Sequence, residues 1–109
     1  MKLINLTPHE LNIHAGGDVI TVAPHDMKNP ARVAMETTLA KNIVVDGYTI
    51  PVFYQIPGEV VNLPAPEAGT MFIVAAMVKE AVGRPDVVSP GPLKRNDAGQ
   101  PIGCEGLSV

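Results

Sequence analysis

Short runs of alternating apolar and polar residues, separated by turn-forming residues, fill most of the chain. In the first run, Lys2–Leu6, Ile4 and Leu6 share one face of an expected strand, and Pro8 ends it because proline lacks a backbone donor. Residues 10–22 contain two further runs around a Gly-Gly turn, which predicts a β-hairpin. The pattern therefore favours many short strands from the start of the chain.

The clearest local signal is the Asp-Gly dipeptide inside residues 43–54. Asp-Gly suits the tight turn of a hairpin, whose central residues need positive φ, and β-rich runs flank it on both sides. Pro51 in the second run indicates an edge position or a bulge. Shorter strands are expected at Ala31–Met35 and Glu59–Leu63, and the polar segment Pro24–Pro30 is expected to be a loop.

A continuous apolar run, Thr70–Val74, is typical of a buried central strand. Good helix formers follow at about residues 75–82, and Gly83 is placed to end that helix. The proline-rich segment Arg84–Pro92 is expected to be a loop, and a turn signal within residues 93–102 predicts a C-terminal hairpin. We therefore predict a mainly β fold, a small antiparallel barrel or sandwich of short strands with one short α-helix. An α+β sheet with one covering helix is the alternative.

Composition and charge narrow the class of protein. The chain has 109 residues and a mass of 11.5 kDa, which corresponds to a single domain spanning residues 1–109. Its 10 glycines and 11 prolines exclude a bundle of long helices. The net charge of −3 argues against a nucleic acid polymer as partner, because phosphate binding needs a basic face. The single cysteine and the lack of a signal-peptide-like or membrane-spanning apolar stretch indicate a cytoplasmic protein with no membrane partner.

The sequence carries no motif of a common enzyme or metal site. A P-loop, a dinucleotide-binding glycine motif, His-Glu-x-x-His and Cys-x-x-Cys are all absent. We therefore expect no cofactor and no metal, and we interpret His9, His14 and His25 as surface or turn residues. Cys104 is expected to be a buried, unreactive thiol. A binding protein is favoured over an enzyme, and the enzyme alternative stays open.

The corner Thr7-Pro8-His9 is the first candidate for a ligand site. It places a hydroxyl and an imidazole close together at a rigid turn, where they can bind a phosphate, a ribose or a base edge. The alternative interpretation is a turn held by Thr7, with His9 packing beside it.

The second candidate is the arginine-containing segment that begins at Arg84. Arginine offers a planar fork that matches phosphate or carboxylate oxygens, and Gly91 permits close approach of the backbone to a ligand. The alternative is a surface ion pair, between Arg84 and Asp86 or between Arg95 and Asp97. Arg32 is predicted to face either the same pocket or solvent. The candidate ligand-binding residues are therefore Thr7, His9, Arg32, Arg84, Asp86, Ser89, Gly91 and Arg95.

The N-terminal motif Asn-Leu-Thr-Pro-His resembles that of a family of small proteins found in bacteriophages, prophages and bacterial genomes. The similarity covers nearly the whole chain and continues in Ala31–Val33, Gly58–Pro64, Gly69–Val74, Arg84–Gly91 and Gly103–Leu107. Where members of that family usually have a serine, this chain has Ala75. The resemblance implies a phage or prophage accessory protein that acts in the cytoplasm of the host bacterium.

Three functions are compatible with these observations. The first is binding of a small phosphorylated ligand, in which the protein sequesters a nucleotide immune signal of the host, by analogy with other small anti-defence proteins. The second is a protein–protein inhibitor or a structural phage component. The third is a metal-independent phosphodiesterase that cleaves a signalling nucleotide, with His9 as general acid or base. The expected partners are a nucleotide-like ligand, further copies of the chain in a homo-oligomer, or a host defence protein.

Overall fold

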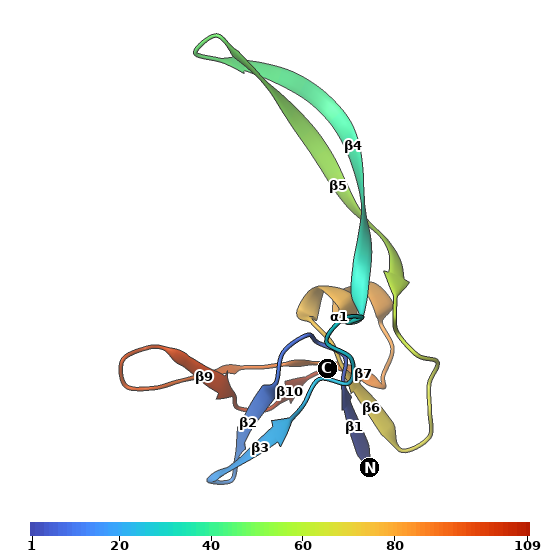
Figure 1. Ribbon diagram of the computed structural model, residues 1–109, viewed down its shortest axis with the longest axis vertical. Coiled ribbons are helices and arrows are strands. Elements are labelled where there is room, and N and C mark those ends of the chain that lie inside the picture. Colours follow the sequence, from blue (N-terminus) through green and yellow to red (C-terminus); the bar gives the residue numbers. More distant parts are fainter.

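The computed structural model describes residues 1–109 and contains ten β-strands and one short helix. Figure 1 shows two parts: a body built from small sheets and the helix, and a long hairpin that projects from it. We call the hairpin, residues 32–61, the arm, and the rest of the chain the body. The molecule measures 57 × 40 × 24 Å. The radius of gyration of 17.9 Å exceeds the ~13 Å of a compact domain of this length, and the arm accounts for the elongated shape.

The first sheet of the body has β6 (Thr70–Ile73) near its centre. Its strand order is β1-β6-β7-β10, with β1 (Lys2–Asn5) and β7 (Val87–Pro90) parallel to β6 and β10 (Leu107–Ser108) antiparallel to β7. Three of the four residues of β6 are buried, as expected for an apolar run covered on both faces.

The second sheet of the body has the order β3-β2-β9-β8. The hairpin of β2 (Leu11–Ala15) and β3 (Asp18–Val22) comes from the start of the chain, and the hairpin of β8 (Leu93–Arg95) and β9 (Pro101–Cys104) comes from its end. The two hairpins join through a parallel contact between β2 and β9. The sheet therefore unites segments that lie about as far apart in the sequence as the chain allows.

Helix α1 (Ala76–Val82) connects β6 to the parallel strand β7 and packs against β7 and against the base of the arm. Gly83 ends the helix in the left-handed conformation, with φ 64°, and its N–H bonds to the Lys79 carbonyl. The helix lacks the length and apolar character needed to cross a bilayer. The main hydrophobic cluster lies beneath it and contains Leu6, Ala31, Phe72, Val74, Val78 and Val87.

The arm consists of β4 (Arg32–Val45) and β5 (Tyr48–Val61), each 14 residues long. Asp46 and Gly47 form its turn with φ values of 51° and 81°, the positive φ that a tight hairpin turn needs. The antiparallel register shifts between Val33 and Met35 and again between Leu39 and Lys41, so the ladder contains two bulges.

The structure confirms the mainly β class, the single short helix and the three hairpins. The strands form three small sheets rather than a closed barrel, and two of the sheets contain parallel pairs. The strands expected at Ala31–Met35 and Glu59–Leu63 are present in large part, but they are not separate short strands: they are the body-proximal ends of β4 and β5. The prediction of a continuous loop over Arg84–Pro92 was wrong, since Val87–Pro90 forms a strand that is almost fully buried.

A buried carboxamide, that of Asn5, connects the parts of the body. Its Nδ2 donates to the His9 carbonyl at 2.8 Å and to the Val22 carbonyl at 3.0 Å. Its Oδ1 accepts from the Thr7 N–H at 3.0 Å and lies 2.6 Å from the Thr7 hydroxyl. Asn5 is only 1% exposed, so these bonds form largely out of water. One side chain thus ties the end of β1 to the following corner and to the end of β3.

Replacing Asn5 with alanine is expected to destabilise the fold by about 1–3 kcal/mol, because buried main-chain groups lose their partners. Denaturant unfolding followed by circular dichroism measures the change. Asn42→Ala, at an exposed position of the arm with no hydrogen bond of its side chain, is the matched control and is expected to change stability by less than ~0.5 kcal/mol. Equal stability of the two variants would contradict the role given to Asn5.

Candidate functional site

The corner at residues 7–9 is organised by its own hydrogen bonds. The Thr7 hydroxyl lies within bonding distance of Asn5 Oδ1, at 2.6 Å, and of the His9 carbonyl, at 3.1 Å. It therefore serves the turn, as one of the two interpretations of the sequence held. The His9 side chain is exposed and makes no hydrogen bond within the protein. Of the two side chains, only the imidazole is free to meet a ligand.

His9 lines an open pocket of about 680 Å³, which we call the His9 pocket. The pocket lies where the segment following the first strand meets the segment around Pro90 and Leu93, which is more than 80 residues away in the sequence. Its surface is largely apolar, and the polar side chains of His9, Glu10 and Asn12 also line it. A lining of this kind suits a ligand that has one polar edge. The lining residues are His9, Glu10, Leu11, Asn12, Pro90, Leu93, Pro101, Ile102, Gly103 and Cys104.

Close contact between β2 and β9 forms the floor of this pocket. A Cβ at Gly103 would lie 2.4 Å from the Asn12 carbonyl oxygen, so only glycine permits this approach, and its φ of 149° also disfavours other residues. The Cys104 thiol is 1% exposed and lies 3.6 Å from the same carbonyl oxygen, to which it donates. The expectation of a buried thiol at Cys104 is therefore confirmed.

Arg84 and Asp86 form a bidentate ion pair. Arg84 Nε donates to Asp86 Oδ1 at 2.9 Å and Nη2 donates to Oδ2 at 2.6 Å, while Nη1 donates to the Pro64 carbonyl at 2.9 Å. The guanidinium carbon also lies 6.0 Å from the centre of the Phe72 ring. The hydrogen bonds from Arg84 hold the pKa of Asp86 below its ordinary value. Arg84 thus joins the turn before β7 to the loop before β6, and most of its donors are already engaged.

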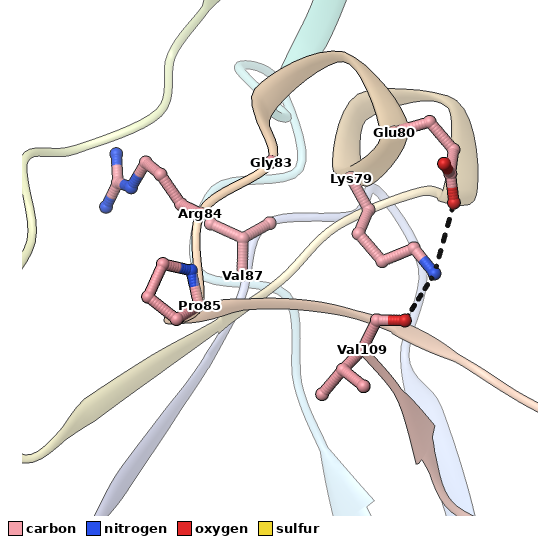
Figure 2. Close-up of a pocket in the computed structure, with 7 residues that line it drawn as sticks. All are labelled: Lys79, Glu80, Gly83, Arg84, Pro85, Val87 and Val109. Carbon is pink, nitrogen blue, oxygen red and sulfur yellow. Dashed lines mark hydrogen bonds and ion pairs between the residues drawn. The ribbon is translucent and has the colours of Figure 1, made fainter.

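Arg84 also stands at the edge of a second, smaller pocket of about 360 Å³ below α1. Figure 2 shows its side chain directed away from Lys79, which points to the opposite side of the pocket. Lys79 Nζ lies 3.1 Å from the Val109 carbonyl oxygen and 3.3 Å from Glu80 Oε1. The two cations therefore do not converge on one point, and each has an oxygen partner in the protein.

The other candidate residues lie at separate places. Arg32 is exposed at the start of the arm. Ser89 is buried on β7. Gly91 lies close to Ser108, since a Cβ added at Gly91 would come within 3.1 Å of the Ser108 hydroxyl. Arg95, at the end of β8, donates one hydrogen bond to the Gly99 carbonyl at 2.7 Å. Of the eight candidates, the structure brings only His9 into the His9 pocket.

The sequence pattern did not single out several of the residues that line the His9 pocket. Glu10, Asn12 and Ile102 belong to β2, β9 or their flanks, and only the parallel pairing of these strands places them together. Gly103 carried the one usable signal, because a glycine inside a strand often marks close approach of another backbone. No group of three or more potential metal ligands is gathered anywhere in the structure.

Comparison of the chain with models of protein families, with curated proteins and with solved structures finds no match.

Acidification tests the ion pair of Arg84 and Asp86. The folded-state pKa of Asp86 lies below its ordinary value of 3.8, so the unfolded chain binds the proton more readily. The stability that the pair contributes is therefore full above about pH 5 and is lost as the pH falls through the folded-state pKa. Asp86→Asn is expected to lower Tm at pH 7, and the difference from the wild type should shrink towards pH 3.

Thermal unfolding between pH 7 and pH 3 measures this difference. Asp18→Asn, at the exposed start of β3, controls for the loss of one negative charge. A gap between wild type and Asp86→Asn that stays the same across the whole pH range would show that the charge of Asp86 does not cause it.

Proposed function

We propose that this protein is a non-catalytic binding protein for a small, phosphorylated, nucleotide-like ligand. The observation that carries the proposal is the His9 pocket, which joins the corner at residues 7–9 to the wall formed by Pro90 and Leu93. The sequence singled out both segments as candidate ligand contacts, although most of the individual side chains differ from those expected.

The lining of the pocket suits the parts of a nucleotide. Leu93, Ile102 and the neighbouring prolines offer apolar surface for a flat base, and Leu93 is 58% exposed before any ligand covers it. Asn12 Oδ1 already accepts from the Thr21 hydroxyl at 2.9 Å, which leaves its Nδ2 to donate to a base edge, and the Glu10 carboxylate can accept from ribose hydroxyls. For the phosphate, the His9 imidazole is a lining side chain that can donate to an oxygen, whereas Arg95 lies outside the pocket and donates to the Gly99 carbonyl.

Binding is favoured over catalysis by the state of the reactive side chains. The Cys104 thiol is buried and bonded to a carbonyl, so it is not presented as a nucleophile. His9 has no carboxylate partner to orient its ring, as a general base in a phosphodiesterase usually needs. A pocket of this kind holds a ligand without changing it, which is the property that sequestration requires.

We propose a biological setting from the resemblance of the N-terminal motif to phage and prophage proteins. In that setting we propose that the ligand is a nucleotide immune signal of the host and that the protein acts in the host cytoplasm. Contact with another protein chain, the alternative function, rests on a different feature of the molecule, the arm.

The test is a thermal-shift and native mass spectrometry panel with ADP-ribose, cyclic ADP-ribose, NAD and cyclic dinucleotides. A ligand present at 100 times its Kd is expected to stabilise the wild type by ~2.7 kcal/mol, which raises Tm by ~10 °C. His9→Ala and Leu93→Asp should each weaken binding, so that the apparent Kd rises at least about tenfold and the Tm shift becomes smaller.

His25→Ala is the matched control, because His25 is an exposed histidine in a loop outside the pocket. Chromatography of the bound nucleotide distinguishes holding from cleavage: recovery of the intact compound supports sequestration, whereas its conversion favours the phosphodiesterase. The absence of any shift across the panel, or an equal shift in wild type and His9→Ala, would overturn the proposal.

A further inference from the structure

Both faces of the arm carry exposed apolar residues, and one face is richer in them than the other. Cross-strand pairing places Val45 opposite Tyr48 and Ile43 opposite Ile50, and the alternate residues of β5 continue the same face. This apolar face contains Ile43, Val45, Tyr48, Ile50, Val52, Tyr54 and Ile56, which include both tyrosines of the chain. The opposite face is mixed: the apolar Met35, Leu39, Val44 and Phe53 alternate with Thr37, Asn42, Thr49, Pro51 and Gln55.

The apolar face has no cover within the chain. Tyr48 is 73% exposed, Tyr54 is 63% exposed and Ile56 is 55% exposed. Figure 1 shows the arm extending away from the body, so that neither face has a second layer along most of its length. Alternation of this kind normally marks a strand with one face buried, and a two-stranded hairpin alone is only marginally stable in water. The pattern of the arm therefore indicates that another molecule covers the apolar face.

We propose that the partner is a second copy of this chain, whose apolar face packs on that of the first with the two arms antiparallel about a two-fold axis. The arrangement of charge supports a copy over a foreign protein. The charged residues on this face are Glu36, opposite Ile56, and Lys41, opposite Val52. The bulge between Leu39 and Lys41 is what brings Lys41 onto the face that Glu36 occupies.

A two-fold axis that crosses β4 near Thr38 and Leu39 makes these charges self-complementary. In an antiparallel pair about that axis, Glu36 of each copy lies near Lys41 of the other, because both residues are equally distant from the axis along the strand. A non-identical partner would have to supply its own complementary charge for each of these residues, whereas a second copy already carries both. A contact that pairs residue i with j and j with i is the signature of a symmetric dimer.

The size of the face is adequate for such a contact. Two strands of 14 residues span ~46 Å by ~10 Å, which gives ~450 Å² of flat surface on each copy before the relief of the side chains is counted. Two such faces together approach the ~1,000 Å² expected of a specific interface. The inference goes beyond the proposed function, because the His9 pocket lies wholly in the body.

Analytical ultracentrifugation of the wild type at tens of micromolar is expected to give a dimer, twice the chain mass of 11.5 kDa. Tyr54→Asp, on the apolar face, should weaken the dimer at least about tenfold, because it places a charge in the contact. Gln55→Asp, the neighbouring residue on the opposite face, adds the same charge and should leave the dimer unchanged. Circular dichroism checks that each variant is folded.

A charge reversal tests the orientation. Glu36→Lys and Lys41→Glu should each weaken the dimer, because each places like charges together, and the double variant should restore it. A monomeric wild type would overturn the proposal and assign the face to another occupant. A dimer that survives Tyr54→Asp, or single reversals that the double variant does not rescue, would overturn the antiparallel face-to-face packing. These readings need no ligand, so they remain separate from the nucleotide test.

Discussion

The body of this protein depends on the hydrogen bonds of one buried carboxamide, that of Asn5. Its two N–H groups and its oxygen satisfy main-chain groups of the corner at residues 7–9 and of the end of β3, while its own backbone oxygen accepts from the His25 N–H. An apolar side chain of the same size would fill the space and still leave those groups unpaired, at a cost that grows with burial. The two sheets are therefore joined by polar bonds of fixed geometry, and the position of His9 at the pocket follows from them.

Local chemistry explains which parts of the fold are predictable from the sequence. The Asp-Gly turn at residues 46–47 and the glycine at the end of α1 act over a few residues, so the sequence identifies them directly. The strand Val87–Pro90 is different, because two prolines nearby suggest a loop, and only its burial between β6 and β10 makes it a strand. The full length of the arm was hidden in a similar way, since the residues between Met35 and Ile43 are polar or weakly β-forming and gain their structure from pairing with β5.

The candidate site shows the same division. The sequence identified His9 and the segment around Pro90, because a rigid corner and a proline-rich stretch have local signatures. It could not identify Asn12 or Ile102, whose proximity results from a parallel contact between the first and last hairpins. Arg84 illustrates the opposite error: arginine suits phosphate, but Asp86 and the Pro64 carbonyl already use its donors, so a side chain chosen for its chemistry has a structural role.

The two strands of the arm leave the body side by side, since Arg32 and Val61 are partners in the ladder. The gap that the body must bridge is therefore the same whether the arm is long or short, and closing a longer loop costs little more than closing a shorter one. Deleting two residues from each strand would keep every side chain on its own face and shorten the reach by ~6.8 Å. The length of the arm can therefore change during evolution in steps of two residues per strand, without any change to the part of the chain that folds around Asn5.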